Sequence, residues 1–145
     1  MKNSYTIFGR GFVGINIVKF LKKKKYKVFV PKKWKYKFNK NLHNIIYCIG
    51  NDKWITDPKG CYDANLGIVP KIIFNNKFDS FTLLSTTRIY SGNPPTKTNE
   101  NNLIHIDPNT NDFLFNSLKL AAENLCLSLP SKKIKVARIS NLFGD

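Results

Sequence analysis

Three glycines near the amino terminus have the spacing of a phosphate-binding loop. Gly9, Gly11 and Gly14 form the pattern G-x-G-x-x-G, in which glycines permit a tight turn and a close approach of the backbone to a pyrophosphate. The pattern follows a strand-like segment, Tyr5 to Phe8, and precedes a helix-like segment, Phe12 to Lys23. Because the amino end of a helix favours phosphate charge, this context predicts a dinucleotide site. A tight turn that binds nothing is the alternative.

The residues around the loop favour NADP over NAD. An acidic residue at the end of the second strand normally binds the adenosine ribose of NAD. Here the strand Lys27 to Val30 continues into Pro31, Lys32 and Lys33, with no carboxylate nearby. Together with Arg10, these lysines could hold a 2′-phosphate. We expect the first part of the cofactor site to comprise Gly9, Arg10, Gly11, Phe12, Val13, Gly14, Lys32 and Lys33.

Alternating strand-like and helix-like segments must position this loop. The strand-like segments are Tyr5 to Phe8, Lys27 to Val30, Asn44 to Ile49, Phe81 to Ser85 and Ile134 to Ile139, and the helix-like segments are Phe12 to Lys23, Gly60 to Asn75 and Asp112 to Leu129. This alternation predicts a Rossmann-like, doubly wound parallel sheet in a three-layer α/β/α arrangement. The segment Pro31 to His43 is too short and polar for a further helix and strand. The stretch from Asn93 to Asn111 is expected to be a surface loop.

Composition limits the class of protein. A chain of 145 residues with 42% apolar residues suits one domain with its own core. The three cysteines, Cys48, Cys61 and Cys126, are odd in number and lack C-x-x-C spacing, so we expect no disulfide framework, no metal site and a cytoplasmic location. No stretch is apolar enough to span a bilayer, so we expect a soluble protein.

The formal net charge of +15 leaves several anionic partners open. Such a charge attracts nucleic acid, an anionic membrane surface or a phosphorylated small molecule. Much of the excess is lysine set among asparagines, which coding bias also produces. Because the sequence has no recognisable nucleic-acid-binding motif, we do not expect nucleic acid as a partner.

Six segments spread over nearly the whole chain match the motifs of one enzyme family. They are IFGRGFVG (Ile7 to Gly14), NIIYCIG (Asn44 to Gly50), DANLG (Asp63 to Gly67), LLSTTRIYSG (Leu83 to Gly92), KLAAE (Lys119 to Glu123) and ARISNLFGD (Ala137 to Asp145). Together they resemble the extended short-chain dehydrogenase/reductase family, which contains NAD-dependent sugar epimerases and dehydratases. Phe8 departs from the pattern, because many members have another glycine there.

The resemblance implies further site residues. It places Thr86, with Ser85 beside it, where the substrate's reacting oxygen is polarised, and it places Lys119 where the nicotinamide ribose is held. It also implies that Ile49, Gly50 and Ser85 lie against the cofactor, that Asn65 buttresses the fold, and that Arg138 and Asn141 organise the cleft. The simpler alternatives are that the hydroxyl residues only end a strand and that the lysine is solvated.

Two features depart from the family pattern. The family's acid/base is a tyrosine four residues before the lysine, and that position is Phe115, which has no phenol for proton transfer. The neighbouring Leu114 and Asn116 do not supply one, and His105 is only a minor candidate. The chain also stops at Asp145, where family members continue into a substrate-binding lobe, so we expect that lobe and the last strand to be missing.

The helix-like segment Asp112 to Leu129 has apolar residues on more than one face. Leu114, Leu118, Ala121 and Leu125 form one stripe, and Phe113, Leu120 and Leu127 form another. A helix that is apolar nearly all round must be covered on both sides. We therefore expect one side to lie on the sheet and the other to form a homodimer, as is common in the family.

These observations predict a single domain, residues 1 to 145, that binds NADP or NAD. The resemblance implies a sugar-nucleotide epimerase, dehydratase or reductase, possessing a nucleotide-sugar partner, whose turnover is impaired or absent because of Phe115 and the missing lobe. A non-catalytic regulatory or interaction subunit that keeps the fold is the first alternative. A basic nucleic-acid-binding domain is the second.

Overall fold

The chain forms a parallel sheet with helices on both faces. The computed structural model describes residues 3–33, 35–91, 98–131, 133–140 and 142. The strands are β1 (Ser4–Phe8), β2 (Lys27–Phe29), β3 (Asn44–Tyr47), β4 (Ser80–Thr86) and β5 (Ile134–Ile139). The helices are α1 (Phe12–Lys23), α2 (Pro58–Tyr62), the π-helix η1 (Asp63–Gly67), α3 (Ile68–Asn75), the 3-10 helix η2 (Thr87–Tyr90) and α4 (Phe113–Ser128).

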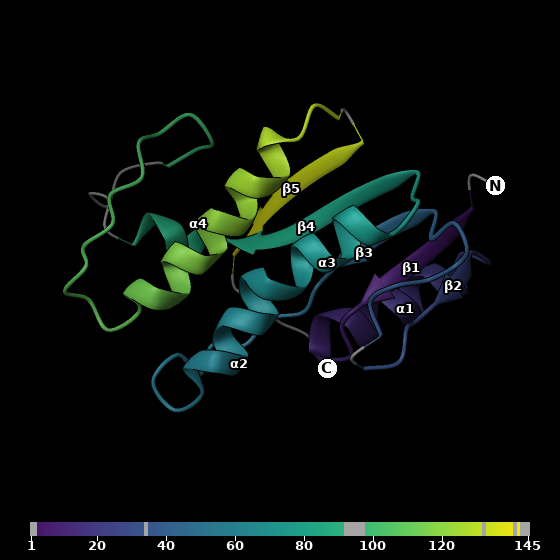
Figure 1. Cartoon of the computed structure of the whole chain (residues 1–145), viewed down its shortest axis with the longest axis horizontal. Helices are drawn as coiled ribbons and strands as arrows, with labels where there is room; N and C mark the ends of the chain where they lie inside the picture. Colours follow the sequence, from purple (N-terminus) through teal and green to yellow (C-terminus); the bar gives the residue numbers. More distant parts are fainter. Residues whose placement is uncertain (1–2, 34, 92–97, 132, 141, 143–145) are drawn as a thin grey trace.

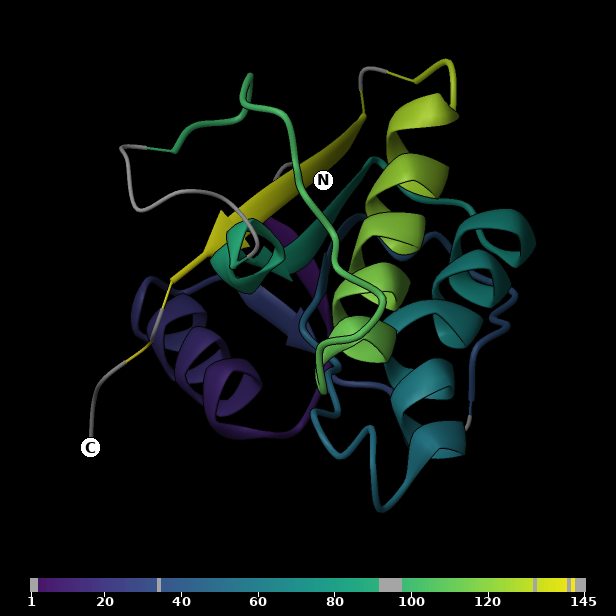
Figure 2. The ribbon, with the colours of Figure 1, turned by 90° about the vertical axis from the view of Figure 1, so that its left-hand side faces the viewer.

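All neighbouring strands of the sheet are parallel, in the order β2-β1-β3-β4-β5. Figure 2 shows α1 on one side of this sheet and α2, α3 and α4 on the other. The order reverses at β1, because the chain moves outward to β2 and then returns to place β3 on the other side of β1. In open α/β sheets, ligands bind at the carboxyl ends of the two strands that flank such a reversal.

The main core lies between the sheet and the helices α3 and α4 (Figure 1). Strand alternation directs every second side chain of β4 inward, so that Phe81, Leu83 and Ser85 are buried. These strand residues belong to a face that packs against apolar side chains such as Ile72 of α3 and Ala122 of α4. The buried face thus holds the carboxyl ends of the strands at fixed positions relative to α4.

Most of the predicted elements are confirmed. The strands lie within two residues of their predicted ends, and the described part of the segment 31–43 holds no helix or strand. The predicted helix from Gly60 begins earlier, at Pro58, because the Asp57 carboxylate accepts a hydrogen bond from the Gly60 amide at 2.9 Å and caps the helix. The short helix η2 was not predicted. The described residues 98–111 contain no regular element.

The buried face of α4 coincides with neither of the two predicted apolar stripes, of which only Leu118 is buried. Phe115, Leu118, Ala122 and Cys126 are buried, whereas Leu114 and Ala121 are exposed. Several helical arcs of this sequence are apolar, so residue type alone did not distinguish the inward arc. Because the inward arc also contains Lys119 and Glu123, polar side chains of the helix are buried beside the sheet.

Candidate functional site

The glycine loop connects the end of β1 to the start of α1, and its three glycines have different surroundings. Gly9 has a φ of 137°, and a Cβ atom there would lie 2.7 Å from the Sγ atom of Cys48. A Cβ atom at Gly14 would collide with the carbonyl oxygen of Gly9. At Gly11, by contrast, a Cβ atom would meet nothing within 4 Å. Close packing therefore requires glycine at positions 9 and 14, whereas Gly11 borders open space.

The amino end of α1 offers unpaired donors to that space. The first hydrogen bond of the helix runs from the Ile15 amide to the Gly11 carbonyl at 3.0 Å, and Gly11 provides no side-chain cap. The amides of Phe12 and Val13 therefore have no acceptor within the helix. Such amides, aligned with the helix dipole, bind phosphate oxygens.

A cleft of about 650 Å³ lies beside the glycine loop. Its lining includes seven of the predicted cofactor residues, namely Gly9, Arg10, Gly11, Lys32, Lys33, Ile49 and Gly50. The predicted residues that do not line it are Phe12, Val13, Gly14, Ser85 and Lys119. The structure adds residues that the sequence analysis missed, among them Tyr36, Asn51, Lys53, Asp57 and Asp63. The polar residues that follow Gly50 in the sequence could have indicated Asn51, Lys53, Asp57 and Asp63.

Basic side chains gather at one end of the cleft. Arg10 donates a hydrogen bond through Nη2 to the carbonyl oxygen of Pro31 at 2.9 Å. This contact ties the glycine loop to the segment after β2, where Lys32 and Lys33 are exposed and line the same cleft. The three cations can therefore act together on one anionic group.

Lys119 does not line the cleft itself, but its side chain extends from α4 toward Gly50, which does. A methyl group built at Gly50 would lie 3.9 Å from Lys119 Nζ and 3.8 Å from Asn65 Oδ1, so both polar groups converge on a cleft-lining glycine. Lys119 is only 7% exposed and has no ion-pair partner among the described residues. Burial lowers the pKa of its ammonium group, although the nearby Glu123 partly opposes the shift.

Asn65 lies in the π-helix η1 and links three parts of the site. Its amide nitrogen donates hydrogen bonds to the carbonyl oxygens of Asn51 at 2.7 Å and Cys61 at 2.9 Å. Its Oδ1 atom is buried and has no hydrogen-bond partner among the described residues. Single π-helical turns inside α-helices are frequent at functional sites. Asn65 therefore supports the fold and also presents an open acceptor near Gly50.

The two hydroxyl residues at the end of β4 have different surroundings. Ser85 lies on the buried face of the strand, and its Oγ atom has no hydrogen-bond partner in the described part of the chain. Thr86 is half-buried on the opposite side, and its Oγ1 atom accepts a hydrogen bond from the Arg88 amide at 3.2 Å. The hydroxyl of Thr86 thus caps η2, whereas that of Ser85 remains open to a partner.

Phe115 packs in a small cluster beside Lys119. Its ring centroid lies 5.7 Å from that of Trp54, and the guanidinium carbon of Arg88 lies 5.1 Å from the centroids of both rings. Phe115 also packs with Cys61 and Leu118. The position of the expected catalytic tyrosine is therefore part of an apolar stack with no titratable group of its own.

Arg138 organises the far side of the site. Its guanidinium donates to both carboxylate oxygens of Glu123, with Nη2 2.7 Å from Oε2 and Nε 3.3 Å from Oε1. Arg138 also donates a hydrogen bond to the hydroxyl of Tyr90. These contacts join β5, α4 and η2. Asn141, predicted to share this role, lies outside the described residues.

The remaining candidates contribute little to the site. His105 is exposed in the segment before α4 and does not line the cleft. No group of three or more histidine, cysteine, aspartate or glutamate side chains suited to a metal ion occurs among the described residues. In the same part of the chain, no helix has the length and apolar character needed to cross a membrane.

Comparisons with known proteins identify the fold. No family model matches the sequence, and no curated protein matches it. RMD from Pseudomonas aeruginosa, solved with NADPH, superposes with a TM-score of 0.73 at 20% identity, over 94% of this chain and 53% of that one. This chain has a Rossmann-like fold. A dTDP-4-dehydrorhamnose reductase from Clostridium acetobutylicum matches with a TM-score of 0.72 at 19% identity, over 98% of this chain and 55% of that one.

A third solved structure agrees with the first two. UDP-glucuronic acid 4-epimerase from Bacillus cereus, in complex with NAD, has a TM-score of 0.73 at 16% identity and covers 97% of this chain and 57% of that one. The chain therefore spans about half the length of the structures it matches. The predicted doubly wound α/β fold is confirmed.

Replacing Lys119 with methionine tests whether this lysine is retained for binding. A buried ammonium without an ion partner destabilises a fold, so K119M is expected to raise the free energy of unfolding by about 1 kcal/mol at pH 7. The unfolded chain binds the proton more tightly because the folded pKa is lowered, so wild-type stability rises as pH approaches the unfolded value of about 10.4. Urea unfolding at pH 7 and pH 10 should therefore show the advantage of K119M shrinking. An unchanged advantage would contradict this explanation.

Proposed function

We propose that residues 1 to 145 form an NAD(P)-binding domain of the extended short-chain dehydrogenase/reductase type. The observation that supports this most strongly is the open space over Gly11, beside amides of α1 that lack helical acceptors. The packing at Gly9 and Gly14 keeps the loop in the shape that creates this space. A pyrophosphate would be held there by these amides, and the lining of the adjoining cleft includes both Lys32 and Gly50.

We propose NADP as the preferred cofactor. Arg10, Lys32 and Lys33 converge at the end of the cleft beyond β2, where the adenosine ribose of a Rossmann-bound dinucleotide lies. A 2′-phosphate would find three cations there. At the other end, Lys119 would donate to the nicotinamide ribose, and Asn65 Oδ1 would accept from a polar group near Gly50. When bound, the nicotinamide would supply hydride chemistry.

The proposed preference for NADP predicts that removing the basic side chains weakens the binding of NADPH but not of NADH. Changing Arg10 and Lys32 together to alanine should weaken NADPH binding at least tenfold, because charge-assisted hydrogen bonds to the 2′-phosphate are lost. NADH lacks that phosphate, so its affinity should change less than twofold. Titration calorimetry with both nucleotides measures each effect. Equal weakening of the two, or a wild-type preference for NADH, would contradict the assignment.

The proposed ligand beyond the cofactor is a nucleotide-sugar, with little or no turnover. One matched structure is a UDP-glucuronic acid 4-epimerase solved with UDP-glucuronic acid and NAD, which motivates this ligand class. In this chain Ser85 would face the substrate oxygen, because its hydroxyl is buried and unpaired, whereas Thr86, also expected there, lies on the opposite face of β4 and caps η2. Phe115 offers no proton, and its stack with Trp54 and Arg88 fills its surroundings. Retention of the fold for a regulatory or interaction role is therefore the second candidate function.

Two further properties are proposed. We expect the protein to be cytoplasmic, because its three cysteines are odd in number and lack C-x-x-C spacing. We also expect a homodimer that uses the predicted segment Asp112 to Leu129, where Phe113, Leu114 and Leu127 remain exposed on α4. Sedimentation equilibrium of the purified chain distinguishes a dimer from a monomer.

A further inference from the structure

The charge of the chain is distributed very unevenly. All nine acidic residues follow residue 51, whereas 13 of the 24 lysines and arginines precede it. Coding bias toward lysine would not by itself exclude aspartate and glutamate from the first 51 residues. The half of the fold that contains β1, α1, β2 and the segment after β2 is therefore a cationic surface, and the dinucleotide cleft uses only a few of its charges.

Part of this surface is hollowed into a groove away from the cleft. The groove has a volume of about 730 Å³ and lies between residues 37–41, before β3, and residues 74–77, at the end of α3. Its lining comprises Lys37, Phe38, Asn39, Lys40, Asn41, Phe74, Asn75, Asn76 and Lys77. Because no residue lines both sites, we name this second site the lysine groove.

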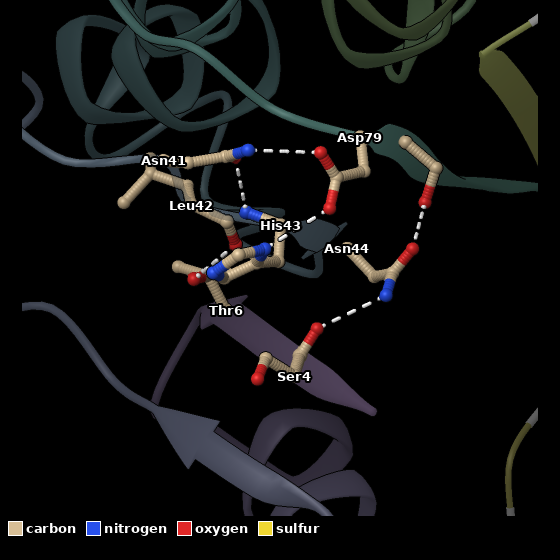
Figure 3. Close-up of polar contacts among 8 residues, drawn as sticks. Ser4, Thr6, Asn41, Leu42, His43, Asn44 and Asp79 are labelled. Atoms are coloured by element: carbon tan, nitrogen blue, oxygen red, sulfur yellow. Dashed lines mark hydrogen bonds and ion pairs between the residues drawn. The ribbon is translucent and has the colours of Figure 1, made fainter. Parts of the chain in front are cut away.

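The walls of the lysine groove are fixed by hydrogen bonds across the chain. Asn76 accepts a hydrogen bond from the Phe38 amide at 2.9 Å and donates to the carbonyl oxygen of Tyr36 at 2.6 Å. At the other end, Asn41 donates to the carboxylate of Asp79 at 2.9 Å (Figure 3). The groove is thus a built feature of the fold.

The lysines of the groove are not neutralised by acidic partners. None of the ion pairs among the described residues involves Lys37, Lys40 or Lys77. The carboxylate of Asp79, which contacts Asn41 of the groove, also contacts the ring of His43, with Nδ1 of the histidine 3.0 Å from Oδ2 (Figure 3). Lys40 Nζ lies 3.6 Å from the ring centroid of Phe29, a contact that does not neutralise its charge, so three positive charges remain to attract an anion.

An exposed aromatic ring accompanies these charges. Phe74 is 61% exposed at the end of α3 and lines the groove beside Lys77. Exposing a phenylalanine costs free energy unless a ligand covers the ring. Lysines that track phosphates, together with a ring on which a base can stack, are the usual components of sites for single-stranded nucleic acid. Such recognition uses the backbone and stacking, so it needs no sequence motif.

We propose that the lysine groove binds a short stretch of single-stranded nucleic acid, with phosphates on Lys37, Lys40 and Lys77 and a base on Phe74. A membrane surface is a poorer fit, because the cations line a concave site and a bilayer contacts protruding residues. The proposal is independent of the dinucleotide function, since the two sites share no lining residue.

The test compares two triple variants of equal charge. A fluorescein-labelled 12-nucleotide oligouridylate is titrated with the wild type, with K37Q/K40Q/K77Q, and with K22Q/K23Q/K24Q, which removes three exposed lysines at the end of α1. The groove variant should bind at least tenfold more weakly in 100 mM salt. In a plot of log affinity against log salt concentration, its slope should be shallower by about 2, because each of the three lost phosphate contacts contributes roughly 0.7 to the slope. The α1 variant should lose less than threefold.

The variant F74A tests the stacking contact, and NADPH serves as a control ligand for the other site. F74A should weaken oligouridylate binding about tenfold, because stacking on one base is lost, and NADPH affinity should stay within twofold of wild type in every groove variant. Equal losses in both triple variants would show diffuse charge attraction and overturn the proposal. Failure of the wild type to bind oligouridylate, or binding only to vesicles containing phosphatidylserine, would also overturn it.

Discussion

Replacing Gly11 with aspartate is expected to weaken NADPH binding at least a hundredfold while leaving the fold intact. Gly11 is the N-cap residue of α1 with φ −81° and ψ −172°, an extended conformation that aspartate adopts readily. A Cβ atom there meets nothing within 4 Å, and aspartate is a favoured N-cap residue. The carboxylate would occupy the proposed pyrophosphate space and repel its charge.

The same position provides the matched control. Gly11→Ser also supplies an N-cap side chain, but it is smaller and uncharged, so its loss of NADPH affinity should be much smaller than that of G11D. Calorimetric titration measures affinity, and thermal unfolding monitors the fold. G11D is expected to unfold at or above the wild-type temperature, because aspartate caps the helix. Tight NADPH binding by G11D would show that the cofactor lies elsewhere.

The second large effect is on stability. Glu123→Ala is expected to lower the free energy of unfolding by about 3 kcal/mol, because it leaves the Arg138 guanidinium without its partner in a largely buried place. Glu123 is 1% exposed, and its carboxylate is the bidentate partner that connects α4 to β5. The melting temperature should fall on the order of 10 °C.

A surface ion pair gives the contrast for this prediction. Lys59 and Asp63 are 2.7 Å apart in an i, i+4 arrangement, and the side chain of Lys59 is 86% exposed. Lys59→Ala should change stability far less than Glu123→Ala, because water screens an exposed ion pair. Urea unfolding of both variants beside the wild type measures the difference. Similar small losses in both would mean that the Arg138–Glu123 contact adds little to the fold.

The elements could be predicted because local chemistry specifies them. The apolar segments of the strands, the glycine loop and the dipole-compatible lysines at the end of α1 each depend on a few adjacent residues. The segment Pro31 to His43 is short, and its length correctly predicted that no further helix and strand lie between β2 and β3 in its described part. These features require no knowledge of which distant residues meet.

The parts of the site that were missed depend on long-range packing. The inward arc of α4 is set by the sheet beneath it, so the sequence alone did not show that Lys119 and Glu123 are buried. The stack of Trp54 and Arg88 on Phe115 joins residues up to 61 positions apart. The unpaired Oδ1 atom of Asn65 lies in a π-helical turn, and the residue types of that turn do not predict a π-helix. The lysine groove also forms only when α3 meets the segment before β3.

Binding of a dinucleotide pyrophosphate at the amino end of α1 can be observed residue by residue. The most direct test is a nitrogen–proton correlation spectrum of the ¹⁵N-labelled chain during titration with NADPH. We expect saturable shifts of the amide signals of Gly11, Phe12 and Val13, since these groups would donate to phosphate oxygens. Unchanged signals for these three amides at millimolar NADPH, in a chain whose spectrum shows it to be folded, would contradict the account.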